Sequence, residues 1–267
     1  MTTTESSTRL TVGGREMAIR HGGEGPPIVF LHGWPVSGVY WNNLIPHLQP
    51  DYHWILVDLP GFGTSEVPEG PLTIAAQAGR IGALLEALDL SEVTLVGHSM
   101  GGMIACCLAA TAFQSRLARL VAVSAPIWGP GGAYWDLRLG SLPLVRRIVV
   151  YLMRYPALRR LVSTRFAPGI VIDEGLLTST DQATDDVVMA TARGLLSTDL
   201  RPLLDRIQIP TLVIYGELDR IVTPSQPLMT LARLPEARLE VYPDTGHCPS
   251  LERPDRFIES LRRFTQN

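Results

Sequence analysis

Three residues that together can activate a hydroxyl nucleophile follow one another along this chain, each after an apolar run. Ser99 lies in G-H-S-M-G, Asp219 closes G-E-L-D, and His247 closes D-T-G-H. A serine hydroxyl is a weak nucleophile unless a neighbouring base takes its proton. A histidine serves best as that base when a carboxylate fixes its tautomer and stabilises its charged form. The chain therefore contains the parts of an activated serine nucleophile.

The stretch around Ser99 has the form of a tight strand-to-helix turn. A run of β-forming residues ends at Gly97, and a helical pattern rich in small residues begins directly after Ser99. In such a G-x-S-x-G turn the serine backbone is strained. The residues two positions away must be small, because a Cβ there would crowd the adjacent strand or helix. Taken alone, the pattern also fits an ordinary glycine-rich turn.

The acid and the base each have competitors in the sequence. Glu217 and Asp244 lie in the same two loops as Asp219 and His247, and Asp219 could instead cap a helix. Among the six histidines, His247 is the one in a loop at a strand end after the acid. His98, inside the turn, is expected to pack or cap rather than react.

Short apolar runs alternate with helical patterns over most of the chain. Alternation of this kind predicts a parallel sheet covered by helices on both faces. In such sheets the working loops lie at the carboxyl ends of the strands, which is where all three residues fall. The predicted strands are 9–12, 16–20, 27–31, 53–57, 93–97, 117–124, 210–215 and 237–242, and the predicted helices are 41–48, 73–88, 100–113, 225–234 and 254–264.

The alternation breaks at Pro126 and resumes only after residue 199. Residues 127–199 have no strand-like run of comparable strength, so we expect a helical cap inserted into a core domain of residues 1–126 and 200–267. Seven arginines lie between residues 138 and 165 with no acid among them. We expect an amphipathic lid whose arginines face water. Recruitment of an anionic substrate, or contact with a membrane or acyl-carrier surface, is the alternative.

The composition narrows the class of protein. The chain has 267 residues, a net charge of −3 and 46% hydrophobic residues, so we expect a sizeable core and no nucleic-acid partner. Residues 1–8 have no apolar stretch typical of a secretory signal, and no apolar run reaches the roughly 18 residues of a membrane helix. Cys106, Cys107 and Cys248 lack metal-ligand spacing. We therefore expect a cytoplasmic protein without metal or cofactor.

Five motifs together make the chain resemble the α/β-hydrolase superfamily over nearly its whole length. They are H-G-x-P at 32–35, D-x-x-G-x-G-x-S at 58–65, G-H-S-M-G-G at 97–102, G-x-x-D at 216–219 and G-H-x-P-x-x-E-x-P at 246–254. The resemblance implies an α/β-hydrolase fold, with a mostly parallel eight-stranded sheet and a lid after the sixth strand. It also favours Asp219 over its two competitors as the acid.

Acyl transfer further needs hydrogen-bond donors for the developing oxyanion. Met100 follows the nucleophile and opens a helix, so its backbone N–H is expected to point toward the site. The resemblance implies a second donor, the backbone N–H of Trp34. Trp34 is also a candidate wall of the acyl pocket, and its bond to Pro35 can be cis. We expect His32 to shape this loop by hydrogen bonds to the backbone, and we expect Asp58 to have a structural role.

These features predict a serine hydrolase of the carboxylesterase class, which cleaves a carboxylic ester of a small to medium, largely apolar substrate through an acyl-enzyme. The loop and turn also resemble those of perhydrolases, epoxide hydrolases and haloalkane dehalogenases. Ser99 excludes the last two chemistries, because an alkylated serine is an ether with no hydrolytic exit. The same residues also support hydrolysis of lactones or C–C bonds, perhydrolysis and acyl transfer. A cofactor-free dioxygenase and a ligand receptor without turnover are further alternatives.

Overall fold

An eight-stranded sheet forms the centre of the computed structural model, which describes residues 5–49, 51–128, 155, 174–180, 182–234 and 236–266. The strand order is β1-β2-β4-β3-β5-β6-β7-β8. β2 is antiparallel to both of its neighbours, and all other pairs are parallel, so the predicted mostly parallel sheet is confirmed. The strands are β1 (Ser6–Val12), β2 (Arg15–Gly22), β3 (Pro27–Leu31), β4 (His53–Val57), β5 (Val93–His98), β6 (Leu117–Val123), β7 (Thr211–Gly216) and β8 (Ala237–Tyr242).

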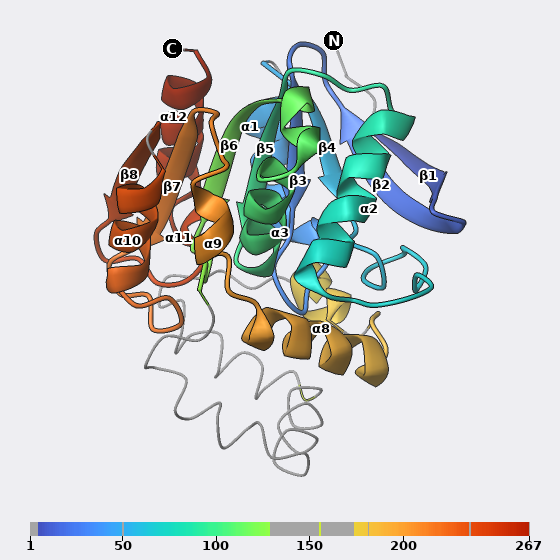
Figure 1. Cartoon of the computed structure of the whole chain (residues 1–267). Helices are drawn as coiled ribbons and strands as arrows, with labels where there is room; N and C mark the ends of the chain where they lie inside the picture. The colour runs from blue at the N-terminus through green and yellow to red at the C-terminus, as the bar shows by residue number, and fades with distance from the viewer. Residues whose placement is uncertain are drawn as a thin grey trace.

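The central strands are buried on both faces because their side chains alternate between two apolar clusters. In β3, Val29 and Leu31 belong to one cluster, and Ile28 and Phe30 belong to the other. Unbroken apolar runs are typical of strands covered on both sides. Helices α2 (Ile74–Ala87) and α3 (Met100–Ala109) cover the face turned toward the viewer in Figure 1. The opposite face is covered by η1 (Gly38–Leu44), α1 (Ile45–Leu48) and α12 (Pro254–Thr265).

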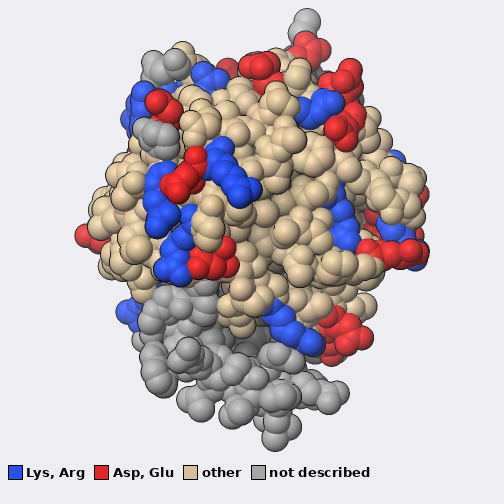
Figure 2. All heavy atoms as spheres, viewed as in Figure 1, with Lys and Arg blue, Asp and Glu red and all other residues tan. Residues whose placement is uncertain are grey.

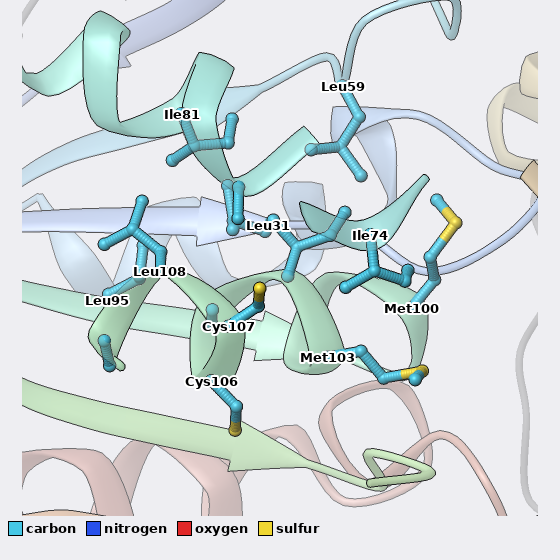
Figure 3. Close-up of a cluster of buried hydrophobic side chains, with 14 of the residues drawn as sticks. Leu31, Leu59, Ile74, Ile81, Leu95, Met100, Met103, Cys106, Cys107 and Leu108 are labelled. Atoms are coloured by element: carbon cyan, nitrogen blue, oxygen red, sulfur yellow. The ribbon is translucent and has the colours of Figure 1, made fainter. Parts of the chain in front are cut away.

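Helix α3 lies in the middle of the first cluster and is buried on all sides. All ten of its residues are buried, which is the position expected for a helix that is apolar all round. Figure 3 shows Leu31 of β3 and both Ile74 and Ile81 of α2 gathered around it. Because Met100 begins this helix, the core packing that fixes α3 also fixes the end of β5.

The elements differ from the predicted ones mainly at their ends. The helix predicted over 100–113 ends at Ala109, because Thr111 accepts a hydrogen bond from the Phe113 N–H and starts the 3₁₀ turn η2 (Ala112–Arg116). The helix predicted over 41–48 is the 3₁₀ turn η1 followed by α1. Two further helices, α9 (Arg201–Leu204) and α11 (Pro249–Glu252), are too short to give a periodic pattern.

The two ends of segment 127–199 lie side by side. The Leu200 N–H donates to the Ile127 carbonyl at 2.9 Å, and Trp128 pairs with Asp199. Between them the described residues form the helices α7 (Glu174–Ser179) and α8 (Asp185–Ser197), and α8 lies at one end of the sheet in Figure 1. The arginine-rich stretch 138–165 falls outside the described residues, apart from residue 155. The cap and the role of its arginines therefore stay predictions.

Charges of both signs are interspersed on the face of the molecule shown in Figure 2. Ion pairs on the described surface include Arg263 with Glu240 and Arg9 with Glu16. At the edge strand β8, α10 (Ser225–Arg233) carries the exposed side chains of Leu228 and Met229. Within the described residues, no helix combines the length and the apolar character that crossing a membrane requires.

Two leucines in helices provide a matched test of this core. Leu108 of α3 is fully buried, whereas Leu228 of α10 is 58% exposed. Leu108→Ala should lower the free energy of unfolding by about 2–5 kcal/mol, because it removes buried surface and leaves a cavity. Leu228→Ala should change it by no more than about 0.5 kcal/mol. Urea denaturation followed by circular dichroism measures both, and equal losses would contradict the placement of α3.

Candidate active site

Ser99 is the single residue between β5 and α3 and forms the sharp turn that joins them. Its backbone has φ 52° and ψ −115°, a conformation that costs energy and persists only where the surroundings enforce it. The Ser99 N–H donates to the Val123 carbonyl of β6 at 2.9 Å. A Cβ on Gly97 would lie 2.3 Å from the Gly101 carbonyl oxygen, and a Cβ on Gly101 would lie 2.3 Å from the Leu31 carbonyl oxygen. The predicted turn and its need for small neighbours are confirmed.

Ser99, His247 and Asp219 form one hydrogen-bonded series. His247 Nε2 lies 3.0 Å from Ser99 Oγ, and His247 Nδ1 lies 2.9 Å from Asp219 Oδ2. All three residues are less than a tenth exposed. An ionised carboxylate only accepts hydrogen bonds, so the proton of a neutral His247 is assigned to Nδ1, and Nε2 accepts the serine hydroxyl. In this arrangement the imidazole can take the hydroxyl proton.

Asp219 is the carboxylate that the structure places against His247. Its second oxygen, Oδ1, accepts the backbone N–H groups of Ile221 at 2.8 Å and Val222 at 3.0 Å. No helix begins directly after Asp219, so these two bonds hold the loop and do not cap a helix, while the other oxygen contacts His247. Glu217 and Asp244 are exposed, and Glu217 Oε2 accepts the Asp244 N–H.

The loop that follows β3 lies directly against the serine. A Cβ on Gly33 would be 3.3 Å from Ser99 Cβ. The next peptide bond, between Trp34 and Pro35, is cis. The Trp34 indole N–H donates to the Val188 carbonyl of α8 at 3.1 Å, so this side chain connects the loop to segment 127–199. Met100 is the first residue of α3, where backbone N–H groups have no partner within the helix.

Two polar residues hold this loop and the loop after β4, as expected. The Leu59 N–H donates to His32 Nε2 at 3.0 Å, which leaves the proton on Nδ1 to donate to the Gly33 carbonyl at 2.8 Å. Burial lowers the pKa of His32 and favours this neutral form. Asp58 accepts the Gly38 N–H at 2.8 Å. Both side chains therefore hold the backbone of these loops by hydrogen bonds.

The structure adds Glu252, to which the sequence analysis assigned no role. Its buried carboxylate accepts the Gly246 N–H at 2.8 Å through Oε2 and the Cys248 N–H at 2.9 Å through Oε1. These two peptide groups flank His247, so Glu252 holds the backbone on both sides of this histidine. The sequence feature that could have identified Glu252 is its position in the motif G-H-x-P-x-x-E-x-P, five residues after His247.

The three cysteines lie in surroundings that keep their thiols protonated. Burial raises the pKa of Cys106 to about 12 and also raises the pKa of Cys107 and of Cys248, which lies beside His247. The thiolate is the reactive form, so these side chains behave as packing groups. Within the described ranges, no group of three or more His, Cys, Asp or Glu side chains could hold a metal ion.

Comparison with known proteins finds similarity along almost the whole chain. The model of the alpha/beta hydrolase family matches residues 28–260. A pimeloyl-[acyl-carrier protein] methyl ester esterase from Photobacterium profundum is 30% identical, over 91% of this chain and 95% of that protein. An uncharacterized protein from Mycobacterium tuberculosis is 31% identical, over 95% of this chain and 79% of that protein. The structure of a thermophilic esterase from Thermogutta terrifontis is 26% identical, with a TM-score of 0.79 over 98% of each chain.

Two glycine-to-alanine substitutions test the turn that presents Ser99. In Gly101→Ala the new methyl group would meet the Leu31 carbonyl, so we expect a loss of at least about 1–3 kcal/mol in the free energy of unfolding. Gly79 of α2 has nothing within 4 Å of its Cβ position, so Gly79→Ala should raise that free energy by about 0.5–1 kcal/mol. Thermal and urea unfolding measure both variants. A neutral Gly101→Ala would show that the turn is looser than described.

Proposed function

This chain belongs to the alpha/beta hydrolase family, and from that premise we propose that it is a serine esterase. Its substrate is a carboxylic ester of a small to medium, largely apolar compound, hydrolysed through an acyl-enzyme. The observation that carries the proposal is the hydrogen-bonded series from Asp219 through His247 to Ser99. Relatives named as esterases support the ester class.

In the proposed reaction Ser99 Oγ attacks the carbonyl carbon of the ester while His247 Nε2 takes the hydroxyl proton. Asp219 stays ionised and stabilises the imidazolium, held by its bonds to the Ile221 and Val222 N–H groups. The imidazolium then protonates the leaving alcohol, and an ester of Ser99 remains. Water attacks that ester with His247 as base, and the carboxylic acid leaves as Ser99 recovers its proton.

We propose that the oxyanion of each tetrahedral intermediate accepts hydrogen bonds from the backbone N–H groups of Trp34 and Met100. Two features support these donors. Met100 lies at the start of α3, where the helix dipole favours negative charge. The Gly33 loop lies against Ser99, and the indole bond to Val188 holds Trp34 in place. Such donors act without reorganisation during the reaction, which makes them a large contribution to catalysis.

The relative from Photobacterium profundum bears the name of a methyl ester esterase, so small alkoxide leaving groups belong in the substrate screen. We would compare p-nitrophenyl esters from acetyl to decanoyl with methyl esters, lactones and diketones. Preference for short or medium acyl esters supports the proposal. Faster turnover of lactones or of the C–C bond of diketones would instead favour those alternatives, which use the same three residues.

Intact-mass analysis after treatment with a serine-directed fluorophosphonate tests the nucleophile. The wild-type protein should gain one adduct, located at Ser99 by peptide mapping, and Ser99→Ala should gain none. Ser115 is a surface serine outside the site and provides the control, since Ser115→Ala should react as the wild type does. Failure of the wild type to react would overturn the acyl-enzyme. Full activity of Ser99→Ala would point to base chemistry without acylation.

The acid is tested by a matched pair of substitutions. Asp219→Asn should lower kcat by about 10⁴-fold, because an amide no longer holds the required tautomer of His247. Glu217→Gln, two residues away and exposed, should leave kcat within about twofold, since its carboxylate bonds the Asp244 backbone. Steady-state kinetics on one ester measures both. The reverse result would transfer the role of the acid to Glu217.

A further inference from the structure

His98 lies between Gly97 and the nucleophile, and its ring is surrounded by other parts of the site. The side chain is buried, and Nε2 lies 2.8 Å from the backbone carbonyl oxygen of His247. A carbonyl oxygen only accepts, so Nε2 carries the hydrogen and donates it. The ring stacks on Tyr40 with centroids 4.5 Å apart and planes 10° from parallel. Tyr40 in turn accepts a hydrogen bond from Ser250, three residues after His247.

The other ring nitrogen of His98 restricts the ring to one protonation state. Nδ1 is buried without a hydrogen-bond partner in the part of the chain that the structure describes, and a Cβ on Gly33 would lie 2.8 Å from it. A proton there would be a buried donor with nothing to accept it. Burial, together with repulsion from a charged His247, lowers the pKa of His98 well below its ordinary value. The ring is therefore neutral, with its hydrogen on Nε2.

Three side-chain hydrogen bonds hold the backbone of residues 246–248, and His98 makes the one to His247 itself. Glu252 accepts the N–H groups of Gly246 and Cys248, so it fixes the two neighbours of His247. His98 donates to the carbonyl of His247, across a sequence separation of 149 residues. Because Ser99 follows His98 directly, this bond ties the backbone of the base to the residue next to the nucleophile.

We propose that His98 is a positioning residue that holds His247 against Ser99 through the Nε2–H to carbonyl hydrogen bond. The inference rests on the proposed function, because it assigns His247 the role of the base. Without the bond, the loop after β8 can shift relative to the turn after β5, and the 3.0 Å contact between His247 Nε2 and Ser99 Oγ lengthens. Errors of about 1 Å in such geometry can reduce a rate on the order of 10²-fold.

The first test compares two substitutions of His98. A glutamine amide nitrogen reaches about as far as Nε2 and can donate to the same carbonyl, whereas leucine fills much of the space with no donor. His98→Leu should lower kcat on the order of 10- to 100-fold with little change in KM, because His98 positions the base and is not assigned a substrate contact. His98→Gln should recover most of that loss. Equal kcat in the wild type and His98→Leu would overturn the proposal.

Val96→Ala supplies the control for a general loss of packing. Val96 is fully buried in the same strand, two residues before His98. The Val96→Ala variant should have a lower melting temperature, as His98→Leu does, while its kcat remains near the wild-type value. If Val96→Ala loses as much kcat as His98→Leu at a similar melting temperature, the role of His98 is packing alone.

A second measurement needs no catalysis. Nitrogen NMR of the wild-type protein labelled with ¹⁵N-histidine should show one neutral histidine with its hydrogen on Nε2, unchanged between about pH 5 and 8. His98→Gln assigns that signal by its loss. A His98 that is charged, or protonated on Nδ1, at neutral pH would overturn the proposal. Should the fluorophosphonate leave Ser99 unmodified, this experiment still reports on His98, so failure of the two proposals can be told apart.

Discussion

The close approach of α3 to the sheet is the constraint on which the rest of the site depends. A single residue, Ser99, separates β5 from the helix, and only glycine fits where Gly97 faces Gly101 and where Gly101 faces the Leu31 carbonyl. That crowding forces Ser99 into a strained backbone conformation between the strand and the helix. The strain is sustained by the burial of all of α3 in the apolar cluster. The packing of the core therefore also fixes the position of Ser99.

Three carboxylates hold the irregular loops at the carboxyl edge of the sheet. Asp219 and Glu252, which are buried, and Asp58, which is half-buried, each accept backbone N–H groups from a different loop. A buried carboxylate needs such donors to offset its loss of hydration, and the loops need acceptors for N–H groups that no strand pairs. Asp219 differs from the others because it keeps one oxygen for the ring of His247. The acid of the proposed mechanism is thus a loop anchor with one oxygen directed at the base.

Much of this arrangement could be predicted because the signals are local. Alternating apolar runs and helical patterns indicate a parallel sheet, and the glycine spacing around Ser99 indicates the turn, since each depends on neighbours in sequence. The residues at which helices and strands end were harder to predict from the sequence. Thr111, for example, ends α3 through its own side-chain hydrogen bonds, which a periodic pattern does not register. The arginines of 138–165 lie outside the described ranges, and their role remains a prediction.

By itself, the sequence determined which reactive groups are present, their order along the chain, and that each follows a strand. Because the carboxyl ends of parallel strands meet at one edge, it also determined that Ser99, Asp219 and His247 come near one another. Only the tertiary structure decided that Asp219, rather than Glu217 or Asp244, contacts His247, and that Glu252 and His98 hold the backbone around this histidine. The physical reason is distance along the chain. Hydrogen bonds between residues as far apart as His98 and His247 depend on strand register and loop packing, which no local pattern encodes.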